Sequence, residues 1–145
     1  MKIKLTEVDF VKIVSDYLLQ DNDTVYLEVP NMGQSIDIVA IKDTNIYAIE
    51  VKLANWKQAI KQCKAHKVIA DYICIALYKK NISFKGYTEI KNNNLGLILY
   101  DKKCFWKIFP PQNKEIWLPQ RKQFEGKLAN GCYSELKQPK NKESK

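Results

Sequence analysis

The strongest constraint on the fold is a pair of β-branched runs joined by a short polar link. The runs, residues 36–41 and 46–52, predict an antiparallel β-hairpin. Three charges interrupt them: Asp37 in the first run, Glu50 and Lys52 in the second. Because strand side chains alternate between faces, Glu50 and Lys52 share one face, and Asp37 can join them from the neighbouring strand. Burying such a cluster is costly unless the charges compensate one another or hold a cation, so the hairpin is a candidate functional site.

Hydrophobic periodicity on both sides of the hairpin predicts the remaining elements. Thr6 and Asp9 can form a capping box at the start of the first helix. A strand, a helix and a strand in series imply a right-handed parallel crossover. The expected fold is α/β, a mixed central sheet flanked by helices in the order α-β-β-β-α-β-α-β-β. The expected helices lie within 5–19, with Thr6 as N-cap, and over 55–69 and 84–92; the other strands cover 24–29, 71–78, 96–100 and 104–109.

The end of the chain differs in pattern from the rest. Pro110-Pro111 predicts a boundary between an α/β domain, 1–109, and a basic C-terminal extension, 110–145. The extension has eight basic and four acidic residues, so its net charge of +4 is half of the chain's +8. That excess favours a polyanionic partner. We expect the extension to dock in part and to be mobile from about residue 138; its candidate docking residues are Trp117, Leu118, Phe124, Leu128 and Tyr133.

The cysteines and the apolar runs bear on the compartment. The four cysteines form no CxxC pair, and the chain has one histidine, which argues against a structural zinc site. We expect reduced, packed thiols in a cytoplasmic protein. No apolar run approaches the ~20 residues of a membrane span, and the first residues lack the apolar stretch of a signal peptide, so we expect no membrane partner.

The charged trio permits a specific chemistry. Asp37 and Glu50 offer hard oxygen ligands, which suit Mg²⁺ or Mn²⁺. A divalent ion there could polarise a phosphodiester and lower the pKa of a bound water. The ammonium of Lys52 could then stabilise charge on the attacking hydroxide or on the phosphate. Each residue alone has an ordinary interpretation, a surface ion pair for Glu50 with Lys52 and a strand-end residue for Asp37.

Asp37 followed by Glu50-Val51-Lys52 across a hairpin resembles the PD-(D/E)xK nuclease superfamily, which has the restriction-endonuclease-like fold. The resemblance covers about half of the chain and is nearest to small Holliday-junction-resolvase-like members. It implies that Asp37, Glu50 and the main-chain carbonyl of Val51 bind the metal. It also implies that Lys52 is the catalytic lysine. Ile36 stands where many members have a proline.

The resemblance extends to the helix after the hairpin. Many members have Gln-x-x-x-Tyr there; Gln62 matches the glutamine, and His66 stands at the tyrosine position. The spacing of four places Gln62 and His66 on one helix flank. Gln62 would support catalysis or be a solvated helix residue, and Glu7 resembles an accessory metal ligand or is a charge at a helix start. The expected nucleic-acid contacts are Lys52, His66, Arg121 and Lys122.

These patterns together predict a Mg²⁺- or Mn²⁺-dependent endonuclease. It would hydrolyse DNA phosphodiester bonds, with selectivity for branched or junction DNA, and act as a homodimer. RNA remains open as a substrate. One alternative is a catalytically silent nucleic-acid-binding module of the same fold, which would bind with a steep salt dependence and would not cut. Another is a structural or partner-binding protein in which the charged trio forms an internal ion-pair cluster.

Overall fold

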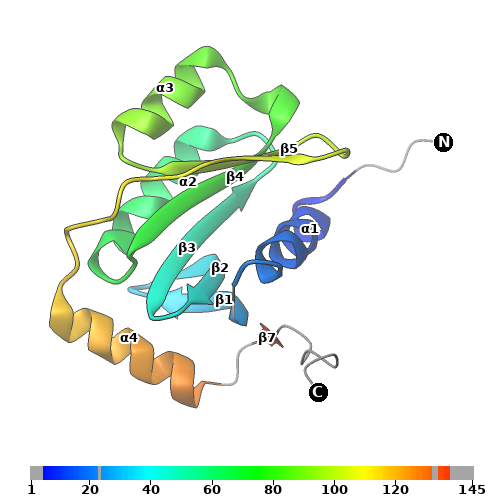
Figure 1. Ribbon diagram of the computed structural model, residues 1–145. Coiled ribbons are helices and arrows are strands. Elements are labelled where there is room, and N and C mark those ends of the chain that lie inside the picture. The colour runs from blue at the N-terminus through cyan, green and yellow to red at the C-terminus, as the bar shows by residue number, and fades with distance from the viewer. Residues whose placement is uncertain (1–4, 23, 132–133, 138–145) are drawn as a thin grey trace.

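The protein is an α/β structure with one mixed sheet between layers of helices. The computed structural model describes residues 5–22, 24–131 and 134–137, and Figure 1 shows their arrangement. Seven strands of this described part pair in the order β6-β5-β4-β3-β2-β1-β7. The neighbours β3, β4 and β5 are parallel, and the other pairs are antiparallel. The strands are β1 Thr24–Asn31, β2 Gln34–Lys42, β3 Asn45–Lys52, β4 Tyr72–Tyr78, β5 Gly96–Tyr100, β6 Phe105–Ile108 and β7 Ser134–Lys137.

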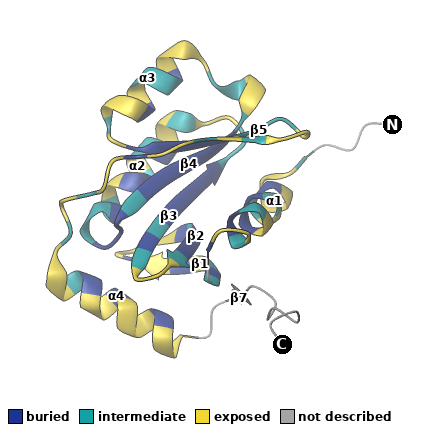
Figure 2. Cartoon of the chain, in the orientation of Figure 1, coloured by how far each residue is buried: buried dark blue, intermediate teal, exposed yellow. Residues whose placement is uncertain are grey.

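Helices cover both faces of the sheet. Helix α1, Glu7–Leu19, packs on one face through Phe10, Val14 and Leu18. Helices α2, α3 and α4 bury residues in the core on the other face, and Figure 2 shows that the central strands are mostly buried. Their bounds are α2 Trp56–Lys64, α3 Phe84–Asn92 and α4 Leu118–Asn130, and two short 3₁₀ turns are η1 Ala65–Val68 and η2 Lys79–Asn81. The predicted α/β class with a mixed, helix-flanked sheet is therefore confirmed.

Local sequence signals predict the first helix and the hairpin correctly. The Thr6 side chain accepts a hydrogen bond from the Asp9 N–H at 3.1 Å, and the Asp9 carboxylate accepts one from the Thr6 N–H at 3.3 Å. This is the predicted capping box. The predicted hairpin is formed by β2 and β3, which pair from Ile38 with Ile49 to Lys42 with Asn45. Among the described residues, no helix has both the length and the apolar character needed to span a membrane.

The helix expected over 55–69 is shorter than predicted. The α-helix ends at Lys64, and the chain continues as the 3₁₀ turn η1. A 3₁₀ turn winds more tightly than an α-helix, so the four-residue spacing no longer keeps two side chains on one flank. Gln62 is consequently half-buried, whereas His66 is fully buried.

The segment after Pro110 contains two elements that the sequence pattern did not predict. Helix α4 buries Phe124 and Leu128 in the same core as the strands, and β7 pairs with β1. The Asn113 amide donates hydrogen bonds to the carbonyls of Lys67 and Ala70 at 2.6 and 2.8 Å. Of the other predicted docking residues, Trp117 and Leu118 are exposed. Tyr133 and the tail from residue 138 lie outside the described residues.

Candidate active site

Asp37 and Glu50 lie where strands β2 and β3 separate. The ladder ends at Ile38 paired with Ile49, and continuing that register by one step sets Asp37 opposite Glu50. The Asp37 carboxylate instead accepts a hydrogen bond from the Val51 N–H, with 2.8 Å between Oδ2 and N. A side-chain oxygen therefore satisfies a main-chain donor just beyond the end of the ladder.

A local irregularity turns Asp37 toward β3. The pairs Leu27 with Ile38 and Val29 with Ile36 are formed, and the pair between them, Glu28 with Asp37, is absent. Glu28 has a positive φ of 52°. Ile36 and Ile38 then pack in different cores although residues two apart in a regular strand share a face. No residue is inserted in either strand, because the pairs on both sides of the missing one keep the same register.

The environment of Asp37 favours its protonated form. Burial is the largest cause, and the charge of Glu50 is the next; together they raise the pKa of Asp37 to about 7. The hydrogen bond from Val51 and the charge of Lys52 act in the opposite direction. Two carboxyl groups close together relieve their repulsion by sharing a proton or by binding a cation.

Glu50 is fully buried and bonded to the only histidine. Its Oε2 lies 2.7 Å from His66 Nε2, and neither side chain is exposed to solvent. His66 Nδ1 lies 3.4 Å from the Asn31 side-chain nitrogen. A buried ring cannot contact nucleic acid, so that predicted role of His66 is wrong. Sequence reasoning did not select Asn31, which precedes the Met32-Gly33 turn and gave no signal beyond that of a turn residue.

Lys52 and Glu7 form a pair at the end of β3. Lys52 Nζ lies 3.9 Å from Glu7 Oε1, and the two side chains are 13% and 49% exposed. Glu7 also accepts a 3.4 Å hydrogen bond from the Leu53 N–H. Lys52 is close enough to lower the pKa of Asp37 by its charge. Glu7 therefore holds the lysine beside the carboxylates, and its role as an accessory metal ligand stays a prediction.

Three buried acceptor atoms have no hydrogen-bond partner among the described residues. They are Glu50 Oε1, Gln62 Oε1 and Asn31 Oδ1. Buried acceptors of this kind are normally satisfied by a donor, a water or a cation. Two hard carboxylates, Asp37 and Glu50, suit Mg²⁺, which keeps several waters of its own. Within the described ranges no group of three or more His, Cys, Asp or Glu side chains is placed to hold a metal, so such a site depends on Asp37, Glu50 and neutral ligands.

Arg121 has a structural role. Its guanidinium pairs with Asp71 at 3.0 Å and with Glu125 at 2.9 Å. It also donates to the carbonyls of Ile69 and Thr44. Because Arg121 is buried and internally paired, its predicted nucleic-acid contact is wrong. Lys122 is exposed on α4, and its contact stays a prediction.

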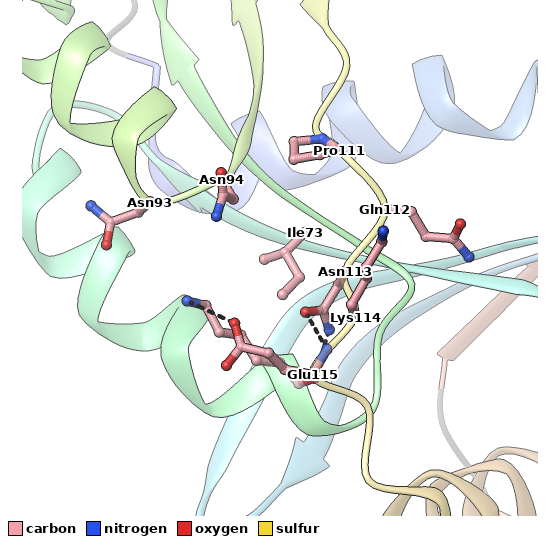
Figure 3. Close-up of a pocket in the computed structure, with 9 residues that line it drawn as sticks. Ile73, Asn93, Asn94, Pro111, Gln112, Asn113, Lys114 and Glu115 are labelled. Atoms are coloured by element: carbon pink, nitrogen blue, oxygen red, sulfur yellow. Dashed lines mark hydrogen bonds and ion pairs between the residues drawn. The ribbon is translucent and has the colours of Figure 1, made fainter.

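Two surface cavities differ in whether they reach the predicted site residues. A cavity of about 290 Å³ lies between η1, the end of α3 and residues 111–115, and Figure 3 shows its lining. Two of the lining residues, Lys67 and Glu115, form an ion pair with 3.7 Å between Nζ and Oε2. None of the predicted site residues lines it. A cavity of about 400 Å³ between α1 and strands β1 and β2 does reach Asp37; it is lined by Val8, Val11, Lys12, Ser15, Asp16, Leu27, Glu28 and Asp37.

Comparisons with known proteins support the fold and give no information about the reaction or the ligands. No protein-family model matches the chain, and no curated protein matches it. Among solved structures it is similar to the SPO1766 protein of unknown function from Silicibacter pomeroyi. The TM-score is 0.65 at 20% identity, over 88% of this chain and 86% of the other. At this identity the similarity concerns the arrangement of helices and strands alone.

Proposed function

We propose that this protein is a metal-dependent endonuclease of the restriction-endonuclease-like fold that hydrolyses DNA phosphodiester bonds. The observation that carries the proposal is the placement of Asp37 and Glu50 at the point where β2 and β3 part, with Lys52 two residues beyond Glu50. A salt bridge on a strand surface would leave Glu50 exposed, whereas here it is fully buried. Burial and then the charge of Glu50 raise the pKa of Asp37, and a divalent cation would relieve the repulsion between the two carboxylates.

Each residue has a definite role in this proposal. Asp37, Glu50 and the carbonyl of Val51 would hold Mg²⁺ or Mn²⁺. When bound, the cation supplies a Lewis acid for the phosphodiester and acidifies a water. Lys52 places a positive charge where the attacking hydroxide and the phosphate oxygens gather negative charge. Its pairing with Glu7 limits the positions of the ammonium group before substrate arrives.

Lysines at the same edge of the sheet support a polyanionic substrate. Strands β3, β4 and β5 are parallel, so their carboxyl ends lie at one edge, beside Lys52. The Asn81 side chain donates to the Leu53 carbonyl at 2.6 Å, which ties η2 to the end of β3. This carboxyl edge bears four exposed lysines, and one of them, Lys79, has its Nζ 4.0 Å from the centre of the Trp106 ring. The four are Lys79, Lys80, Lys102 and Lys103.

The direct test is cleavage of a panel of branched, duplex and single-stranded DNA by the purified protein. We expect products with Mg²⁺ or Mn²⁺ and none with a chelator. An RNA panel run alongside decides between the two nucleic acids. Lack of cleavage of every substrate with either metal, by protein that is folded, would refute the proposed activity.

One observation favours a second candidate, a silent nucleic-acid-binding module. Glu50 Oε2 is already bonded to His66, and a carboxyl pair with one raised pKa can share a proton in place of a cation. This candidate predicts salt-dependent DNA binding on the same panel without metal-dependent products.

A further inference from the structure

Three buried polar side chains from separate parts of the fold contact one another in a row that ends at the Glu50 carboxylate. Asn31 comes from the end of β1, His66 from η1 and Glu50 from β3. All three are buried. The contacts run from the Asn31 amide nitrogen to His66 Nδ1 at 3.4 Å, and from His66 Nε2 to Glu50 Oε2 at 2.7 Å.

The orientation of the Asn31 amide determines where the His66 proton lies. The Asn31 nitrogen also lies 3.2 Å from the Ala65 carbonyl oxygen. A carbonyl only accepts, so turning the amide would set two oxygens against each other. The NH₂ group therefore faces His66, and His66 Nδ1 must accept. The ring proton then lies on Nε2 and is donated to Glu50.

In this arrangement the N–H at His66 Nε2 fixes one carboxylate oxygen of Glu50, Oε2, in place. The other oxygen, Glu50 Oε1, has no hydrogen-bond partner among the described residues. This oxygen lies next to the Asp37 carboxyl group, so the pair can share a proton or bind a cation.

We propose that Asn31 and His66 are positioning residues for metal binding. They hold Glu50 Oε2 by a hydrogen bond and so leave Oε1, together with Asp37, for the divalent cation. The inference rests on the proposed function and adds two residues that do not touch the substrate. Partners that orient a ligand in this way typically change metal affinity by about 10- to 100-fold when they are removed.

The single histidine allows a direct test of the proton position. In protein labelled with ¹⁵N-histidine, without metal, we expect Nε2 to carry a hydrogen, which it donates to Glu50. A ring with its hydrogen on Nδ1 and none on Nε2 would overturn the proposal. It would leave the proposed nuclease activity untouched.

Metal affinity tests the positioning role independently of cleavage. Mg²⁺ and Mn²⁺ binding is measured by calorimetry for the wild type, His66→Leu, His66→Gln and the control Cys74→Ala, which is buried on β4. We expect His66→Leu to bind metal at least about 10-fold more weakly. His66→Gln restores a donor near the Nε2 position and should recover most of the affinity, while Cys74→Ala should match the wild type.

The outcomes separate this proposal from the proposed function. If the wild type binds metal and folded His66→Leu binds it equally well, the positioning role is wrong and the nuclease proposal stands. If the wild type binds neither metal, both proposals fail. If His66→Leu does not fold, Asn31→Ala takes its place, with a weakened metal affinity expected and an unchanged one overturning the inference.

Discussion

Among single residues, Lys52 separates turnover from binding. Its ammonium lies at the end of β3, paired with Glu7 and near Asp37. We expect Lys52→Ala to lower the cleavage rate by about 10²-fold or more, which in practice abolishes cleavage. The reason is that the variant lacks the positive charge that stabilises the negative charge developing in the transition state. DNA affinity should fall by less than 10-fold, since one phosphate contact among several is lost. The measurements are single-turnover cleavage and binding with chelator.

A matched lysine controls that experiment. Lys61 is exposed on α2, and Lys61→Ala removes the same charge away from the carboxylates. It should cleave at the wild-type rate. Cleavage by Lys52→Ala at that rate would rule out the proposed mechanism.

Asp37 should make the stability of the metal-free protein depend on pH. Its pKa is about 7 in the folded state and 3.8 in the reference state. Between these values the folded protein binds more protons than the unfolded chain, so the free energy of unfolding falls as pH rises. After solvent screening the slope is at most about 1 kcal/mol per pH unit. Urea unfolding with chelator at pH 5 and pH 8 should show the fall in the wild type.

The variant Asp37→Asn provides the comparison. It cannot ionise, so the fall in stability between pH 5 and pH 8 should shrink, and added Mg²⁺ at pH 8 should stabilise the wild type more than the variant. Equal pH profiles for the two proteins would show that Asp37 does not titrate in this range.

At the scale of the element, helix α4 is held to the sheet by Arg121. This side chain links α4 to Asp71 and to the Ile69 carbonyl, which lie between η1 and β4. Arg121→Met keeps the length and leaves Asp71 without its cation, so we expect a loss of about 3 kcal/mol in the free energy of unfolding. Chemical denaturation measures it, with the exposed Lys122→Met as control. A loss below about 1 kcal/mol would contradict this role.

At the scale of the whole molecule, the carboxyl edge of the parallel strands is the proposed path of the nucleic acid. We expect Lys79→Ala with Lys80→Ala to weaken DNA binding and to lower the slope of log affinity against log salt by about 2. Both lysines are exposed beside the end of β3. The measurement is binding across a series of salt concentrations.

An equal change of charge elsewhere tests whether location matters. Lys114, which precedes α4, and Lys127, which lies in α4, are exposed near the opposite end of the strands. Replacing both with alanine should change the slope less. If the two double variants behave alike, the effect is one of total charge and the carboxyl edge is not the path.

The sequence alone determined the features that depend on neighbours along the chain. Alternation and helical spacing predicted the hairpin of β2 and β3, the α/β class and the Thr6 cap, because those patterns repeat within a few residues. It also selected Asp37, Glu50 and Lys52, since charges inside apolar strands stand out locally. It did not predict α4, whose apolar residues recur without a clear helical stripe.

Only the tertiary structure decided which distant groups meet. His66 contacts Glu50 across 16 residues and Asn31 across 35, and Arg121 meets Asp71 across 50. The turn of Asp37 toward β3 depends on the irregular pairing of Glu28 on the adjacent strand. The physical reason is the same throughout: local propensity acts over a few residues, whereas these contacts arise when packing brings separate segments together and buried polar groups must find partners there.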